Sequence, residues 1–337
     1  MPIPVQTLGV IADKIGVSTM SVSRALSNKA GVSRELRERI LRVARELGYR
    51  PNPLIGALMA NVRAKSRDPV RTGTVLAFVS RADRASDVRF EHFRGAATAA
   101  EEQGYKLEKF IVGKSGYTPE RLSEILYARH ILGVLISPLA TGHGHYDLDW
   151  GKFSTVVIEY TFTEPAFDRV VHDNYAAMKL ILDRCRERGH RRIGLIFTTN
   201  ALERTKGLYE AAYWMEQKTT RAFTALPPLR LEAWDKAQVT RWFDQYRPQV
   251  LITSASLIQD CGDFLRRRKQ VIPRDCALVN VNVARDTDIG GIRQDNELIG
   301  ATAVRLLIDK INRNDRGIPD RPCTVLTPGL WVAGKTF

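Results

Sequence analysis

From residue 74 onward, short apolar segments alternate with longer amphipathic stretches. The apolar segments are nearly continuous in Val, Ile and Leu, which is typical of strands buried on both faces of a sheet. The stretches between them repeat apolar residues at helical spacing. This alternation predicts an α/β fold with parallel, doubly wound sheets. We expect strands at 74–80, 131–138, 154–160, 192–197, 250–255 and 277–283, and helices at 91–103, 119–129, 175–188, 203–217, 236–246, 257–269 and 296–313.

The first 50 residues follow a different pattern, which predicts three short helices. Apolar residues recur at helical spacing over 7–14, 19–26 and 34–47, and Gly16 and Gly48 interrupt the pattern. A tight turn with glycine joins the first two of these helices, and the second is short and polar on its outer face. This arrangement is typical of a helix-turn-helix. The predicted N-caps are Thr7, Ser18 and Ser33.

Basic residues are concentrated at the start of the chain. The formal net charge is +14, and residues 1–68 hold twelve Lys or Arg against five Asp or Glu, a net charge of +7. Half of the excess positive charge therefore lies in about a fifth of the chain. A basic region of this kind suits a polyanionic partner such as DNA, although a solvated basic face is the plainer alternative.

Composition and motifs argue against several other classes of protein. The four cysteines have no CxxC spacing, which argues against a zinc ribbon or a disulfide framework and favours reduced thiols. The sequence has no signal peptide and no apolar run of ~18 residues, so we expect a cytoplasmic protein with no membrane contact. It has no nucleophile elbow, P-loop or dinucleotide fingerprint, and His143 and His145 lack a third ligand. We therefore expect no enzyme activity, no metal and no cofactor.

The segment TLGVIADKIGVSTMSVSRALSNKAGVSRELRERILRVARELGYRPNPLIGALMA (7–60) resembles the DNA-binding head of the LacI family of bacterial regulators. Nearly every fixed position of the family pattern is met over about 50 residues. The rest of the chain resembles the core of that family at lower stringency. The matching motifs there are EEQGYKLE (101–108), VVHDN (170–174), ERGHRRIGLI (187–196), RTKG (204–207), IRQDNELIG (292–300) and LWVAGKT (330–336).

The resemblance implies a helix-turn-helix head (1–50), a hinge helix (51–62) and a core (74–337) similar to periplasmic sugar-binding proteins. The basic linker between hinge and core (63–73) is longer than usual for the family. The core would consist of two doubly wound parallel-sheet subdomains, with the effector in the cleft between them. We expect the first subdomain at about 74–188 plus 295–324 and the second at about 189–294 plus 325–337.

By this resemblance, the second helix of the head enters the major groove of double-stranded DNA, and its first residues face the base edges. Thr19 and Met20 hold the variable base-reading positions of the family, and Arg24 can bind a guanine edge with two hydrogen bonds. Hydroxyls and helix starts suit phosphate contacts, although simple helix capping is compatible with the same groups. The candidate DNA-contacting residues of the head are Thr7, Ser18, Thr19, Met20, Ser21, Ser23, Arg24 and Ser33.

Residues 51–62 resemble the hinge helix of the family, of which two pair across a dimer and enter the minor groove at the operator centre. Asn52 and Pro53 begin this hinge. Leu58, with Ala57 beside it, holds the position of a leucine that wedges into a base step and kinks the DNA. Packing of Leu58 against the head is the alternative. A two-fold dimer matches a palindromic operator with two half-sites.

The resemblance also indicates candidate effector contacts in the core. Arg204 holds the position of an arginine that meets effector hydroxyls or a carboxylate. Ser254 and Asn282 stand where the family usually has an asparagine and an aspartate, and Ala255 replaces a second aspartate, so the effector preference is open. Phe90 and Trp234 are further candidates, since each could offer an aromatic face to a sugar ring or could lie in the core instead. Gln294 is the last candidate, because it lies near a crossover and can reach the pocket.

These observations predict a sequence-specific transcriptional regulator. We expect a repressor that binds a palindromic operator as a homodimer and responds to a sugar or related metabolite. A transport-type binding protein would carry an export signal and no basic head, and an enzyme would need convergent acid, base or nucleophile residues. Repression and activation stay open, because promoter position separates them. Whether the effector releases the DNA or tightens its binding also stays open.

The assignment of the hinge leads to a test at Leu58. We expect Leu58→Ala to leave the head folded and to weaken operator binding, because the apolar wedge that kinks the DNA would be lost. Operator affinity, measured with the full chain and with circular dichroism as the control for folding, checks this expectation. Unchanged affinity would contradict the assignment.

Overall fold

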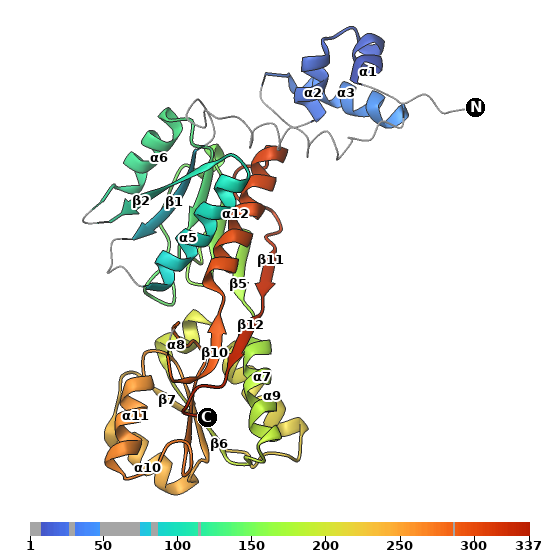
Figure 1. Cartoon of the computed structure of the whole chain (residues 1–337). Coiled ribbons are helices and arrows are strands. Elements are labelled where there is room, and N and C mark those ends of the chain that lie inside the picture. The colour runs from blue at the N-terminus through green and yellow to red at the C-terminus, as the bar shows by residue number, and fades with distance from the viewer. Residues whose placement is uncertain (1–7, 27–30, 48–74, 82–86, 114–115, 286) are drawn as a thin grey trace.

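The computed structural model describes residues 8–26, 31–47, 75–81, 87–113, 116–285 and 287–337 (Figure 1). These ranges contain the helices of the head and two six-stranded sheets. The candidates Thr7, Asn52, Ala57 and Leu58 lie outside the described residues, as do the hinge segment 51–62 and the linker 63–73. In the described ranges, no helix is both long and apolar enough to cross a bilayer.

Three short helices form the head, close to their predicted bounds: α1 (Leu8–Ile15), α2 (Thr19–Leu26) and α3 (Arg34–Glu46). Ser18 Oγ accepts a hydrogen bond from the Ser21 N–H at 3.1 Å, and Ser33 Oγ accepts one from the Leu36 N–H at 3.3 Å, so both caps form. The predicted helix-turn-helix is confirmed. One apolar residue from each helix is fully buried in the core of the head: Ile11, Val22 and Ile40.

Six strands and three α-helices form the first subdomain of the core, as far as it is described. They are β1 (Val75–Arg81), α5 (Asp87–Glu102), β2 (Lys106–Val112), α6 (Pro119–Ala128), β3 (Gly133–Ile136), β4 (Ser154–Ile158), β5 (Arg169–His172), α12 (Asn296–Arg313) and β11 (Thr324–Thr327), with a short 3-10 helix, η1 (Trp150–Lys152). The sheet is parallel, with the order β11-β5-β4-β3-β1-β2. Because α5 and α12 cover one face and α6 the other, the central strands are buried on both sides.

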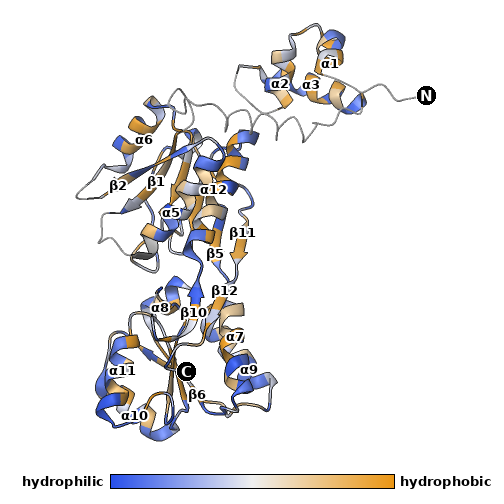
Figure 2. Cartoon of the chain, viewed as in Figure 1, coloured by the Kyte–Doolittle hydropathy of each residue, from blue (hydrophilic) through white to orange (hydrophobic). Residues whose placement is uncertain are grey.

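The second subdomain repeats this architecture. Its elements are α7 (Asn174–Glu187), β6 (Ile193–Thr198), α8 (Thr199–Arg204), α9 (Leu208–Thr219), β7 (Leu229–Leu231), α10 (Lys236–Tyr246), β8 (Val250–Thr253), α11 (Ile258–Arg267), β9 (Ala277–Asn280), β10 (Gly290–Gln294) and β12 (Gly329–Val332). The sheet order is β12-β10-β9-β8-β6-β7, with β12 antiparallel to β10. Figure 2 shows apolar strands inside the sheet and largely hydrophilic surfaces on α10 and α11. The predicted α/β fold with two doubly wound subdomains is confirmed.

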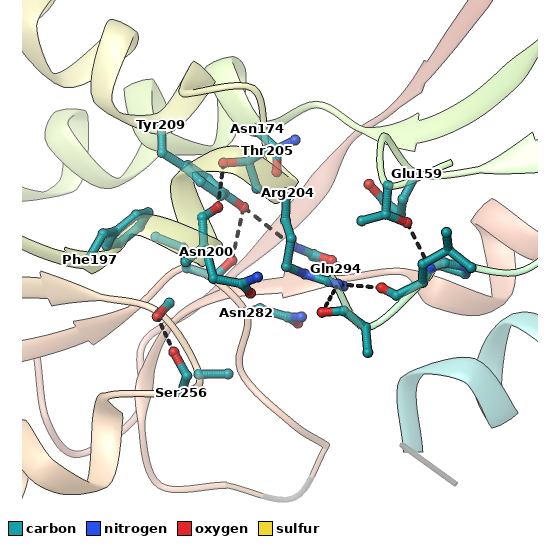
Figure 3. A pocket seen from close by; sticks show the side chains of 18 of the residues that line it. Glu159, Asn174, Phe197, Asn200, Arg204, Thr205, Tyr209, Ser256, Asn282 and Gln294 are labelled. Carbon is teal, nitrogen blue, oxygen red and sulfur yellow. Dashed lines mark hydrogen bonds between the residues drawn. The ribbon is translucent and has the colours of Figure 1, made fainter. Parts of the chain in front are cut away.

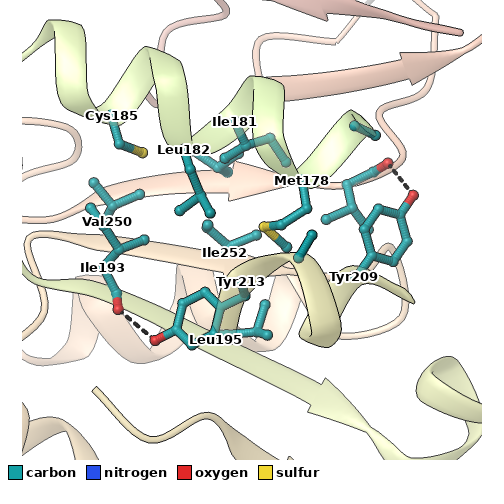
Figure 4. Close-up of a cluster of buried hydrophobic side chains, with 14 of the residues drawn as sticks. Met178, Ile181, Leu182, Cys185, Ile193, Leu195, Tyr209, Tyr213, Val250 and Ile252 are labelled. Atoms are coloured by element: carbon teal, nitrogen blue, oxygen red, sulfur yellow. Dashed lines mark hydrogen bonds between the residues drawn. The ribbon is translucent and has the colours of Figure 1, made fainter. Parts of the chain in front are cut away.

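The chain crosses between the two sheets three times, and the first crossing differs from the expected boundary. It lies between β5 and α7, near Asp173, rather than near residue 188. The reason is that α7 packs on the second sheet, where Met178 and Leu182 are fully buried in one cluster with Ile193 (Figure 4). The second crossing, between β10 and α12, lies at the expected place, near residue 295.

The third crossing joins β11 to β12. It follows Thr327 rather than residue 324, because the whole of β11 pairs with β5 in the first sheet. A Cβ on Gly329 would lie 2.5 Å from Ile292 Cγ2 and 2.7 Å from His172 Cε1. The absence of a side chain at Gly329 therefore allows His172 of β5 and Ile292 of β10 to lie directly against the crossing.

The apolar pattern predicted the central strands and missed those nearer the edges of the two sheets. All six predicted strands occur, and β2, β5, β7, β10, β11 and β12 were not expected. β2 and β7 lie at sheet edges and carry exposed charged residues, and β10 begins with Gly290 and Gly291, so none of them shows a continuous apolar run. The helix expected over 203–217 is divided into α8 and α9, because Lys206 and Gly207 have positive φ angles of 52° and 66°.

The backbones of α5 and α12 are in direct contact. A Cβ on Gly95 would lie 2.0 Å from the carbonyl oxygen of Glu297, and one on Gly300 would lie 2.0 Å from the carbonyl oxygen of His92. These glycines therefore fix how closely the two helices approach each other and hold His92 in place.

We expect Gly300→Ala to lower the free energy of unfolding by about 1–3 kcal/mol, because the added methyl group has no room. Gly262→Ala in α11 is the matched control. Its Cβ would meet its nearest neighbours at 3.5 and 3.6 Å, so it should be neutral or stabilising by up to about 1 kcal/mol. Urea denaturation of both variants measures the difference. If Gly300→Ala were as stable as the wild type, the close approach of the helices would be wrong.

Candidate functional site

A cavity of about 380 Å³ lies in the cleft between the two subdomains. The carboxyl ends of β3 and β4 reach it from the first sheet, and those of β6, β8 and β9 reach it from the second. Ligands of open α/β folds bind at such strand ends. The lining residues are His92, Pro138, Leu139, Ala140, Glu159 and Thr161 from the first subdomain, and Asn174, Phe197, Asn200, Ala201, Arg204, Thr205, Tyr209, Ser254, Ala255, Ser256, Val281, Asn282 and Gln294 from the second (Figure 3).

The wall from the second subdomain carries amide and hydroxyl groups held in place by hydrogen bonds. Ser254 Oγ and Ser256 Oγ lie 2.9 Å apart, and Gln294 Nε2 donates to Tyr209 Oη at 3.3 Å. The side chain of Asn282 lies in the same wall. Amides and hydroxyls both donate and accept hydrogen bonds, so this wall suits an uncharged ligand rich in hydroxyl groups.

Tyr209 provides the aromatic floor of this wall. It is almost completely buried, its hydroxyl donates to the carbonyl oxygen of Val281 at 3.3 Å, and its ring packs edge-on against Phe197 with 5.7 Å between centroids. The two bonds of the hydroxyl, to Val281 and from Gln294, fix the ring. The floor is therefore rigid before any ligand binds.

Arg204 spans the cavity. It ends α8 in the second subdomain, and its Nη1 donates to the backbone carbonyl oxygens of Leu139 and, at 2.9 Å, of Ala140 in the first subdomain. The Leu139 N–H in turn donates to Thr161 Oγ1 at 2.8 Å. The guanidinium therefore links the two subdomains at the cavity, and Figure 3 shows it between Asn200 and Glu159.

Glu159 is the one carboxylate among the described residues that line the cavity. It follows β4 with a φ of 63°, a left-handed conformation that is uncommon for a residue other than glycine. Its Oε1 accepts a hydrogen bond from the His172 N–H at 3.3 Å. Burial raises the pKa of Glu159 to about 7, against the opposing effects of the His172 N–H and of the charge on Arg204. A carboxyl group of this kind can donate or accept a hydrogen bond near neutral pH.

The structure brings four of the six predicted effector contacts to the cavity, namely Arg204, Ser254, Asn282 and Gln294. Phe90 and Trp234 are not among the lining residues, and both aromatic predictions need correction.

Phe90 lies on the outer face of α5. Its side chain is 53% exposed, and Lys109 Nζ lies 5.2 Å from the centroid of its ring. Successive residues of an α-helix are turned by about 100°, so Phe90 and His92 point to nearly opposite sides. His92 is the residue of this pair that lines the cavity.

Trp234 lies between β7 and α10 and is not among the residues that line the cavity. It packs edge-on against Phe264 with 6.2 Å between ring centroids. It lines a separate hollow of about 340 Å³ between α10 and α11, together with Asp260 and Arg267. Its ring packs on the outside of the buried hydrophobic cluster of the second subdomain that contains Phe264.

The sequence pattern did not point to Glu159, His92 or Tyr209. Glu159 lies near the end of the segment predicted as a strand (154–160) and directly follows the observed β4, and a carboxylate at the carboxyl end of a parallel strand is a signal that could have revealed it. His92 and Tyr209 each lie within a helix. From the sequence alone, a side chain there that lines a cavity cannot be distinguished from one that is buried in the core.

The predicted base-reading residues share the outer face of α2. Thr19, Ser23 and Arg24 are exposed, and Met20 is 63% exposed, which is unusual for a large apolar side chain. Val22 and Ala25 form the buried face of the same helix. The remaining predicted DNA contacts among the described residues are Ser18 and Ser33, which are exposed, and Ser21, which is half-buried.

Two family models match the chain. Residues 7–52 match bacterial regulatory proteins of the lacI family, and residues 182–337 match the periplasmic binding protein-like domain. Among curated proteins, the HTH-type transcriptional regulator CelR of Thermobifida fusca is 26% identical over 327 residues, which cover 90% of this chain and 92% of CelR. The HTH-type transcriptional repressor CytR of Escherichia coli (strain K12) is 24% identical over 345 residues, covering 98% and 96%. Both of these relatives are named as transcriptional regulators.

Solved structures share the fold over the whole chain. A complex of the regulator CelR with cellobiose superposes with a TM-score of 0.59 at 22% identity, covering 98% of this chain and 100% of that one. The lac repressor dimer bound to operator gives a TM-score of 0.57 at 17% identity, with 98% of both chains covered. The order of a helical head followed by two sheets is therefore common to these proteins.

The raised pKa of Glu159 predicts a pH dependence of stability. The carboxyl loses its proton near its ordinary pKa of 4.5 in the unfolded chain but keeps it up to about 7 in the fold. Between these values the folded state binds more protons, so the free energy of unfolding falls as the pH rises. Glu159→Gln, which does not titrate, should lose this fall and gain stability relative to the wild type between about pH 5 and pH 8. Thermal unfolding of both ligand-free proteins over this range measures the effect, and parallel curves would contradict it.

Proposed function

We infer that this chain is a member of the LacI family of bacterial regulatory proteins, and we propose that it is a transcriptional repressor that binds a palindromic operator as a homodimer. A small molecule, a sugar or related metabolite, would bind in the cleft of the core and control the affinity for DNA. Such a regulator would act in the bacterial cytoplasm. The cavity between the subdomains, with its wall of amides and hydroxyls, is the observation that carries the proposal of an effector.

The face of α2 supports the assignment of the DNA reader. Thr19 and Met20 would read base edges in the major groove, with Met20 offering apolar contact to a thymine methyl group, and Arg24 would bind guanine. Hydroxyl groups at the helix starts, on Ser18 and Ser33, would contact phosphates. The assignment of a minor-groove wedge to Leu58, and of Thr7, Asn52 and Ala57 to DNA contacts, stays a prediction from the sequence.

The chemistry of the cavity supports a neutral, hydroxylated effector. Its volume of about 380 Å³ is near the lower end of the usual range for small-molecule sites. Asn282 and Gln294 can each donate to and accept from sugar hydroxyls, and Tyr209 adds a fixed aromatic edge. A related regulator has been solved with cellobiose, which supports a carbohydrate as the class of ligand.

Arg204 provides the means by which an effector could alter the angle between the subdomains. It binds the carbonyl oxygens of Leu139 and Ala140 across the cavity, and a ligand hydroxyl or carboxylate would compete for the same guanidinium. An effector that binds one arrangement of the subdomains more tightly than the other shifts the population toward it. In a homodimer, that shift would alter the spacing of the two heads and hence the affinity for a palindromic site.

Selection of random duplex DNA on the purified full chain tests the proposal. We expect enrichment of a palindromic site, with binding that weakens steeply as salt rises, because phosphate contacts release counterions. Arg24→Ala should relax the preference at one base pair of each half-site by about 1–3 kcal/mol and leave the other positions unchanged. Because this substitution lies in the head and leaves the core untouched, the variant is expected to fold as the wild type does, and a change at one base pair can be assigned to the lost side chain. Enrichment of no motif, with and without a metabolite pool, would reject the proposal.

A further inference from the structure

Two buried polar side chains of the cavity have no hydrogen-bond partner among the described residues. They are His92, with both Nδ1 and Nε2 unpartnered, and Asn174, with Nδ2 unpartnered. His92 is 1% exposed and Asn174 is 2% exposed, and both line the cavity. A buried polar group without a partner is costly and uncommon in folded proteins. A ligand in the cavity would supply the missing partners.

Some of the groups around His92 are paired, whereas Asn296 Oδ1, like the imidazole, has no hydrogen-bond partner among the described residues. On the same helix, Glu91 Oε2 accepts a hydrogen bond from Asn296 Nδ2 at 2.8 Å, and Arg94 binds Glu297. Burial lowers the pKa of His92 to about 3, although the neighbouring Asn296 side chain opposes this shift. The imidazole is therefore neutral at physiological pH, with one nitrogen that donates and one that accepts.

The position of His92 is fixed by the backbone. Gly300 of α12 lies directly against the carbonyl oxygen of His92, so the backbone of α5 is closely packed at this residue. Asn174 begins α7 in the second subdomain, next to Asp173, whose Oδ1 accepts from the Ala176 N–H at 2.9 Å. The two unpartnered groups thus come from opposite subdomains, each on a helix that is held in place.

We propose that His92 and Asn174 form a polar subsite in which His92 binds one hydroxyl group of the effector and determines which hydroxylated ligands are accepted. A neutral imidazole donates one hydrogen bond and accepts one, which complements a single hydroxyl group. The Nδ2 group of Asn174 donates to a second oxygen of the same ligand. This inference rests on the proposed function, and it names the residue that separates a hydroxylated ligand from its deoxy analogue. A site built to bind a hydroxyl rejects the analogue that lacks it, because the site's own polar group is then left unpaired.

The stability of the ligand-free protein gives a first test that needs no known effector. We expect His92→Leu to raise Tm by about 2–4 °C, because an apolar side chain of similar size removes an unpaired buried polar group. Phe90→Leu, two positions earlier on the exposed face of the same helix, is the matched control and should leave Tm nearly unchanged. A lower Tm for His92→Leu would show that the fold itself needs the imidazole, and would overturn the proposal.

Ligand selectivity gives the second test. Calorimetric titration of the full chain with D-glucose, D-ribose, D-xylose and cellobiose identifies sugars that bind, and each is then compared with its monodeoxy analogues. We expect His92→Leu to weaken the parent sugar at least about tenfold and to erase the preference over one deoxy analogue, whereas Phe90→Leu keeps both. An unchanged preference in His92→Leu would overturn the proposal. If no sugar binds the wild type, the proposed sugar effector fails, and the comparison of Tm values still decides the role of His92.

Discussion

Three covalent crossings between the sheets determine how the core is built. Because they join β5 to α7, β10 to α12 and β11 to β12, each subdomain is assembled from separate stretches of chain. The strands of both sheets end at the cleft, and their carboxyl ends provide both walls of the cavity. Across that cavity the subdomains are joined by polar contacts of Arg204, which a ligand can replace. The crossings keep the walls opposite each other, and the polar contacts leave their angle adjustable.

The cavity combines rigid support with incomplete hydrogen bonding. The close approach of α5 and α12 at Gly95 and Gly300 supports one wall, and the bonded Tyr209 supports the other. Against this support, both ring nitrogens of His92 and Nδ2 of Asn174 have no partner within the described part of the chain, and Glu159 keeps an uncommon backbone conformation. Unpaired buried polar groups and backbone strain lower the stability of the unliganded fold. They are therefore typical of sites where a bound ligand compensates for that loss of stability.

Much of this architecture could be predicted from the sequence, and the failures have physical causes. The caps and glycines of the head act locally, so the bounds of α2 follow directly from the pattern. The amphipathic pattern of α7 predicted a helix, but such a pattern shows that one face is buried without saying on which sheet. For the same reason the sequence does not show that His92 rather than Phe90 faces the cavity, since the rotation of α5 depends on its contact with α12. Arg204 and Asn282 could be predicted because they stand at positions of the family pattern that carries the resemblance, and such positions do not depend on the rotation of a helix.

The small space at Gly329, where His172 and Ile292 lie against the third crossing, would make this point the pivot if the two subdomains rotate relative to each other. The first sheet then acts as a lever arm, with its carboxyl ends near the pivot and Val75, the start of β1, at the far end. Seven residues of extended strand span about 20 Å, so a rotation of about 15° would swing Val75 along an arc of about 5 Å. A change too small to disturb the packing at the pivot would thus become a displacement comparable to one helical turn at the point where the chain enters the core.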